Sequence, residues 1–192
     1  MSAVKNSYST TRVLVECAIL IAIGTVLSKI TLYTMPMGGS VTLLSLLPFI
    51  IISFRHGTKW GLISGIANVI LQIVVGGLYM PPAGTALALA GSIFLDYVLG
   101  FIVFGLAAFF AKPFKNKAFG VAFGSAFTCF LRFMASFVSG FLIWASITEE
   151  GISAVTYSLG YNASYMVPET ILTTVAAFLI YKKAPQIFAS VK

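Results

Sequence analysis

The chain has 192 residues, of which 59% are hydrophobic and only 9% charged, and its mean hydropathy is +1.00. This composition is typical of an integral membrane protein and excludes an ordinary soluble domain. The net charge of +7 does not indicate a nucleic-acid-binding protein, because the lysines and arginines stand mostly at the ends of apolar runs.

Six apolar runs are predicted to be membrane-spanning helices. They cover residues 12–32, 41–54, 60–79, 91–111, 118–146 and 155–181. The second run is short against the ~20 residues of a full span. We expect it to be tilted, capped by a structured loop or extended by residues 38–40. The chain is therefore predicted to be one all-α membrane domain, a bundle of six transmembrane helices over residues 1–192.

Two apolar stretches are compatible with either a membrane span or another structure. The first run follows Lys5 and Arg12, as the apolar part of a signal peptide would. Residues 13–30 are long enough to span, and no clear small-x-small cleavage site follows them, so we expect a retained first helix. Residues 80–90 contain two prolines and a glycine, and we expect a loop packed on the bundle.

The positive charges predict the orientation of the bundle. With six spans, nearly all of them fall on one side, which should be the cytoplasm: Lys5, Arg12, Arg55, Lys59, Lys112, Lys115, Lys117, Lys182, Lys183 and Lys192. The opposite side receives residues 31–40, 80–90 and the acidic loop 148–150. Lys29 and Arg132 depart from the pattern. Both termini are therefore predicted to be cytoplasmic.

Motifs for chemistry are scarce. The sequence contains no P-loop, so active transport would draw its energy from an ion gradient or from partner subunits. His56, the only histidine, is expected in a solvated cytoplasmic loop, and no cluster of metal ligands or Ser–His pair falls within a span. An intramembrane enzyme is therefore disfavoured. Cys17 and Cys129 lie in apolar runs, and we expect them to be buried without a disulfide.

Asp96 and Arg132 are ionisable residues inside long apolar runs. A charge within a spanning helix is costly, so it usually faces a partner, a cavity or a ligand. Arg132 shares a helical face with Ser136, Gly140 and Trp144, which follow at intervals of four residues.

The predicted orientation places several further polar residues in the outer half of the membrane. Together they predict a pocket that opens outward and is formed by Asp96, Tyr97, Arg132, Trp144, Tyr157 and Asn162. A carboxylate, amide and phenol groups and an indole face suit a small, flat, heteroaromatic solute, either neutral or cationic.

Each of these residues also has a structural explanation. Asp96 and Arg132 fit a buried ion pair, and Asn162 fits a hydrogen bond between helices. Trp144 and Tyr157 fit an aromatic belt at the interface. Two other acidic residues are interpreted structurally: Glu169 follows Pro168 and is expected to cap or brace a kink, and Glu16 is expected to pair with Arg12 one turn earlier.

The first span carries a small-residue pattern. Ala18 and Ala22, continued by Gly24, would let another helix approach closely. A partner subunit is one candidate for that helix.

Three stretches of the chain resemble the thiamine-binding S-component of energy-coupling factor (ECF) transporters. They are Asp96-Tyr97, the segment from Arg132 through Gly140 to Trp144, and the segment from Tyr157 through Asn162 to Glu169. The likeness covers essentially the whole chain. It implies a multi-pass protein of the prokaryotic cell membrane that binds a vitamin from outside with high affinity. It also implies a shared transmembrane coupling subunit and two ATPase subunits as partners, so that ATP is used by those subunits and not by this chain.

Position by position, the resemblance implies two sets of functional residues. The substrate-binding set is Tyr79, Asp96, Tyr97, Arg132, Ser136, Gly140, Trp144, Tyr157 and Asn162. The contact with the coupling subunit falls on Ala18 and Ala22.

The chain also departs from the family pattern. Ser136 stands where well-known thiamine binders carry a histidine, and the first outer loop contains no tryptophan. Asp96 replaces a glutamate, and Arg132 replaces a lysine, which changes a point charge into a planar fork. Thiamine is the first substrate expected. A related ring compound, such as the thiamine pyrimidine precursor or another B vitamin, is the alternative.

A different class of transporter also fits part of the pattern. An autonomous secondary transporter would explain a polar pocket within the membrane, but such proteins often contain internal repeats. No convincing repeat occurs here, and 192 residues is small for that class.

Overall fold

The computed structural model describes residues 3–148 and 150–189, with side chains from residue 10 onward. The side chain of Lys5 and the whole of Glu149 and Lys192, whose charges are part of the predicted orientation, lie outside this part. Within it, five helical segments are long and apolar enough to cross a membrane. The first begins at Thr10 within α1 (Ala3–Leu27). The other four are α2 (Leu47–Gly76), a composite segment Ala86–Ala111, α6 (Lys117–Leu142) and α7 (Ala154–Lys183).

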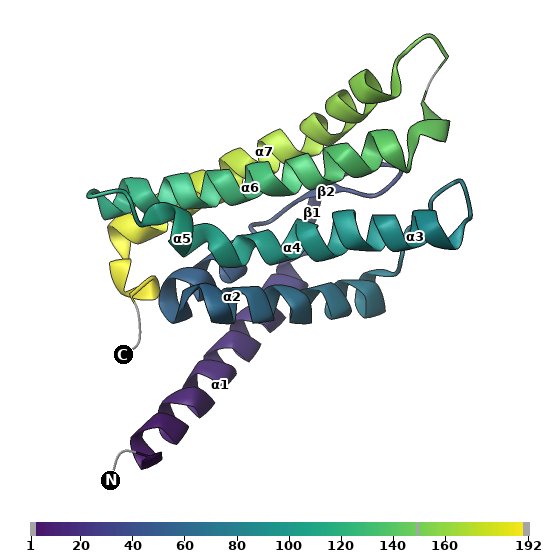
Figure 1. Ribbon diagram of the computed structural model, residues 1–192. Helices are drawn as coiled ribbons and strands as arrows, with labels where there is room; N and C mark the ends of the chain where they lie inside the picture. The colour runs from purple at the N-terminus through teal and green to yellow at the C-terminus, as the bar shows by residue number, and fades with distance from the viewer. Residues whose placement is uncertain (1–2, 149, 190–192) are drawn as a thin grey trace.

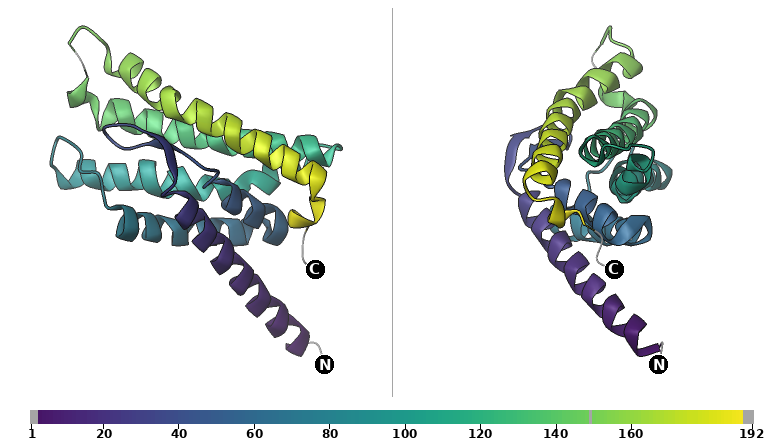
Figure 2. Two further views of the ribbon diagram at one scale, coloured as in Figure 1. Left: turned by 180° about the vertical axis from the view of Figure 1, so that it is seen from behind. Right: turned by 90° about the vertical axis from the view of Figure 1, so that its left-hand side faces the viewer.

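The helices form one elongated bundle. Figure 1 shows α2, the composite segment, α6 and α7 running alongside one another, while α1 crosses the bundle diagonally and its N-terminal half projects away from it. Two short 3-10 turns follow α6 and α7, η3 (Ala145–Ile147) and η4 (Pro185–Ile187). The views in Figure 2 show that both chain ends lie toward the same end of the molecule.

The second and third predicted spans overlap a single helical element, α2. This element covers residues 47–54 of the second predicted span and residues 60–76 of the third. It is interrupted at Gly57, whose φ of 84° and ψ of 171° are not helical. The bend of α2 at Gly57 is shown by the contacts that both arms make with Gly105. The Gly105 carbonyl accepts a hydrogen bond from Ser53 before the break, and a Cβ placed on Gly61 after the break would lie 2.6 Å from the Gly105 Cα. Ser53 and Gly61 therefore both pack on Gly105, on either side of the kink at Gly57.

The segment Ala86–Ala111 is helical throughout but irregular. It consists of α3 (Ala86–Ser92), a π-helical stretch η1 (Ile93–Leu99), α4 (Gly100–Ile102), a 3-10 stretch η2 (Val103–Leu106) and α5 (Ala107–Ala111). It begins earlier than predicted, inside residues 80–90, which were expected to form a loop. Thr85 explains the early start, because its side chain caps the helix by accepting a hydrogen bond from the Ala88 amide at 3.2 Å.

A β-hairpin joins α1 to α2, where the sequence predicted the first outer loop. Strands β1 (Thr31–Thr34) and β2 (Ser40–Thr42) pair antiparallel. The turn between them contains Gly38 and Gly39, with φ of +88° and +87°, a conformation that favours glycine. The small hairpin is the one departure from an all-α membrane fold in the described residues.

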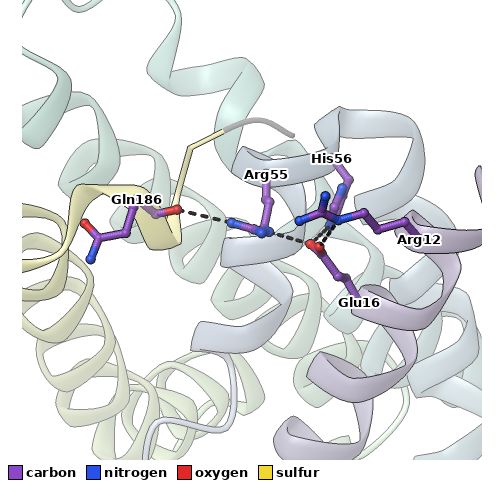
Figure 3. Close-up of polar contacts among 5 residues, drawn as sticks. All are labelled: Arg12, Glu16, Arg55, His56 and Gln186. Carbon is purple, nitrogen blue, oxygen red and sulfur yellow. Dashed lines mark hydrogen bonds and ion pairs between the residues drawn. The ribbon is translucent and has the colours of Figure 1, made fainter. Parts of the chain in front are cut away.

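A cluster of charges holds the end of the bundle near the chain termini (Figure 3). The Glu16 carboxylate lies 3.0 Å from Arg12, 2.6 Å from Arg55 and 3.2 Å from Nε2 of His56, and Arg55 also donates to the Gln186 carbonyl. The predicted Arg12–Glu16 pair is thus confirmed. The prediction of a solvated His56 is wrong, since its side chain is 1% exposed. These contacts join α1, the break in α2 and η4.

The two cysteines behave as predicted. Cys17 and Cys129 are both buried and free. They belong to the main apolar core, to which α1, the first arm of α2, the composite segment, α6 and α7 all contribute.

Candidate functional site

A cavity of about 380 Å³ lies between the hairpin, α2, the composite segment, α6 and α7. Every residue predicted to bind substrate lines it: Tyr79, Asp96, Tyr97, Arg132, Ser136, Gly140, Trp144, Tyr157 and Asn162. Residues that are more than 80 positions apart in the sequence therefore meet around one space. Its volume is in the range of small-molecule sites.

Asp96 provides the negative charge of the cavity from the π-helical stretch η1. Its Oδ2 accepts hydrogen bonds from Ser92 at 2.8 Å and from Ser139 at 2.6 Å. π-helical turns, such as the one that carries Asp96, are often found at functional sites. The ion pairs among the described residues all involve Glu16, so Asp96 and Arg132 do not form the structural pair that the sequence allowed.

Arg132 provides a positive charge and unused donors. Its guanidinium carbon lies 4.3 Å from the centre of the Phe101 ring. Its Nη1 is buried and has no hydrogen-bond partner among the described residues. A buried donor without a partner is costly, and an acceptor atom of a bound solute would remove that cost.

Asn162 is anchored inside the contact between α6 and α7. Its Nδ2 donates to the Ser158 carbonyl at 2.9 Å, and its Oδ1 accepts from Tyr165 at 2.8 Å. Nδ2 also lies 3.4 Å from the Ser136 carbonyl across the helix interface. The structural explanation of Asn162 is therefore confirmed, and the same side chain lines the cavity.

Gly140 allows the two helices to approach at this level. A Cβ there would collide with the Ser158 hydroxyl and would lie 3.3 Å from Nδ2 of Asn162. Trp144 follows the end of α6 and is half-buried. The face predicted from the four-residue spacing thus does line one wall of the cavity.

Tyr79 and Tyr97 shape the opposite wall. The Tyr97 hydroxyl accepts from the Tyr79 amide and donates to the Gly77 carbonyl, both at 3.3 Å. A Cβ on Gly38 would lie 3.2 Å from the Tyr79 ring, which therefore packs against the turn of the hairpin.

Two residues that hold the hairpin against α7 were not predicted as site residues. Glu169 is 3% exposed and accepts two hydrogen bonds of 2.7 Å from Thr42, one from the amide and one from the hydroxyl. Tyr161 accepts from the Met37 amide and donates to the Gly38 carbonyl, both at 2.9 Å. Glu169 therefore anchors β2, in place of the expected role at a kink. Its position deep in an apolar span was the signal available in the sequence.

The small-residue pattern of α1 is divided by the structure. Ala18 and Ala22 lie on the exposed side of the helix. Gly24 is buried and faces the bundle, since a Cβ there would lie 2.7 Å from the Phe49 ring. The open surface therefore carries the two alanines and not the glycine.

A helical bundle that crosses the membrane and encloses a polar, aromatic-lined cavity defines an integral membrane protein for a small solute. Residues 14–189 match the family described as thiamine transporter protein (Thia_YuaJ). The chain belongs to this family, which consists of transporters and not of enzymes. It is accordingly a multi-pass membrane protein, as predicted.

Individual relatives support the assignment. The chain is 31% identical over 190 residues to the thiamine transporter ThiT of Bacillus subtilis, covering 93% of this chain and 95% of that protein. It is 28% identical over 191 residues to the thiamine transporter ThiT of Lacticaseibacillus paracasei, covering 93% and 90%. A solved structure of ThiT from Listeria monocytogenes has a TM-score of 0.76 at 20% identity and covers 94% of this chain and 99% of that one. At that identity the likeness shows a shared fold.

Proposed function

We propose that the chain is the thiamine-binding S-component of an ECF-type importer. The observation that carries the proposal is that the acidic, basic and aromatic residues predicted for binding line one cavity. Thiamine combines a cationic thiazolium ring with an aminopyrimidine. The carboxylate of Asp96 suits an amino group or the positive charge, and Trp144 offers a face for stacking. The relatives from two bacteria are both named thiamine transporters, which supports thiamine as the substrate.

Ser136 marks where this cavity differs from the family pattern. The side chain is small and lines the cavity, in the place of a ring-enclosing histidine. No residue of the first outer loop supplies a tryptophan, and the hairpin contributes Met37 and its two turn glycines to the lining instead. Thiamine is the proposed substrate. A wider space near Ser136 would instead favour binding of a related ring compound.

Transport in this proposal depends on partner subunits. The exposed alanines of α1, Ala18 and Ala22, form the contact with a shared transmembrane coupling subunit, and two ATPase subunits supply the energy. The two arms of α2 act as two crossings, a short one before Gly57 and a longer one after it. This gives six crossings and places both termini in the cytoplasm.

Uptake of labelled thiamine into a thiamine-auxotrophic bacterium that lacks its own transporter tests this proposal. The chain should support uptake only when the coupling subunit and both ATPases are expressed with it. Binding of thiamine to the chain alone should persist. Uptake by the chain without the other subunits would instead support an autonomous secondary transporter. Running the pyrimidine precursor in parallel would identify a changed substrate.

A further inference from the structure

A second hollow lies at the other end of the bundle from the predicted outer opening. It has a volume of about 210 Å³ and is lined by residues of the first arm of α2, α5, α6, α7 and the segment after η4. None of its lining residues lines the first cavity. Arg55, one residue after the lining residue Phe54, bonds to Gln186, which places the hollow beside the charge cluster near the chain termini.

The wall of this hollow is apolar and firmly packed. Phe188 lies edge-on to Phe54 and to Tyr181, with ring centres 5.7 Å apart in both pairs. Ala111 and Val121 are buried and complete the wall. A soluble anion would leave such a wall in contact with water, whereas an acyl chain would cover it.

Two lysines stand at the hollow without acidic partners. Lys112 and Lys117 both line it and are both exposed. Neither belongs to an ion pair among the described residues, in which Glu16 is the only acid that is paired. Lys117 is also the first residue of α6, so the positive end of that helix dipole adds to the local potential.

The hollow lies where two candidate spans end and begin. Lys112 directly follows the candidate span Ala86–Ala111, and Lys117 begins the next candidate span. Basic pockets between helices on the cytoplasmic side of a membrane are suited to anionic lipid headgroups. We propose that this hollow binds one anionic phospholipid, with its phosphate between Lys112 and Lys117 and an acyl chain against the aromatic wall. The proposal does not depend on the identity of the solute in the first cavity.

Native mass spectrometry of the purified protein in mixed micelles tests the site. With phosphatidylglycerol and phosphatidylcholine at equal concentration, the wild-type protein should retain phosphatidylglycerol preferentially. Lys112→Gln combined with Lys117→Gln should lower that retention by about 10-fold or more, because each lysine near the surface contributes to the attraction. Lys182→Gln with Lys183→Gln is the matched control, because it removes the same charge from residues that do not line the hollow.

Three further outcomes decide the matter. Ala111→Leu, which leaves the charge unchanged and fills the hollow, should also lower lipid retention; monodisperse elution and an unchanged unfolding midpoint would show that each variant is folded. An equal loss of lipid retention in the two double-lysine variants would overturn the proposal, because it would show that diffuse surface charge attracts the lipid. Displacement of the lipid by inorganic phosphate at the same concentration would overturn it in favour of a soluble anion.

Discussion

In the proposed site, Asp96 is the residue on which we expect binding of a cationic solute to depend most. Its carboxylate is held by Ser92 and Ser139 and lines the cavity. Asp96→Asn should weaken thiamine binding by about 10-fold or more, because a charge-assisted hydrogen bond would be replaced by a neutral one. Equilibrium binding of labelled thiamine to the purified variant is the measurement. An unchanged dissociation constant would remove Asp96 from the site.

Gly140 offers a steric test at the same level of the bundle. Gly140→Ala should weaken binding, because its new methyl group would displace Ser158 and then Asn162. The expected loss is about 5-fold or more, since overpacking of this kind typically costs 1–3 kcal/mol. Gly160→Ala is the matched control, because Gly160 lies on α7 with nothing within 4 Å of the added Cβ. Equal binding by the two variants would show that the close approach at Gly140 does not shape the cavity.

At the scale of single residues, the sequence predicted nine of the residues that line the cavity. A charge or an amide in an apolar span has few explanations, so Asp96, Arg132 and Asn162 could be selected from composition and spacing. Tyr161 could not, because its hydroxyl binds the turn of a hairpin that has no clear signal in the sequence. Glu169 stands out as an acid in an apolar run, but its partner Thr42 lies 127 positions away, and one sequence does not reveal such a pair.

Among the elements, α1 carries the surface that we assign to the partner. Ala18→Trp should leave thiamine binding intact and abolish uptake, because a large side chain would keep another helix from approaching. Uptake and binding are measured on the same membranes. Ile23→Trp is the control, since it exchanges one large exposed residue of α1 for another. Normal uptake by the Ala18→Trp protein would contradict the docking role.

The elements differ from the predicted spans where the backbone is irregular. Hydropathy located each apolar run, but it carries no information on a kink such as the one at Gly57. The π-helical stretch around Asp96 is likewise invisible to a pattern of apolar residues. The hairpin was missed because β1 and β2 have only four and three residues, too few for alternation to be recognised.

For the whole molecule, the orientation in the membrane is the main untested prediction. Lys115→Cys should react with a membrane-impermeant maleimide only after the cells are permeabilised, because it lies in the predicted cytoplasmic loop. Ile152→Cys should react in intact cells. The native cysteines are buried and should contribute little background. Labelling of Lys115→Cys in intact cells would show that the topology is the reverse of the prediction, with the cavity opening toward the cytoplasm.

The whole-molecule account depends most directly on thiamine entering the cavity beside Trp144. The chain contains two tryptophans, Trp60 and Trp144, and Trp60 packs against the apolar core instead of lining the cavity. The decisive measurement is a fluorescence titration of the purified, ligand-stripped protein with thiamine. We predict saturable quenching at nanomolar thiamine in the wild-type protein and its loss in Trp144→Phe. Unchanged fluorescence of the wild-type protein, with no binding in a parallel equilibrium assay, would contradict the assignment of this cavity to thiamine.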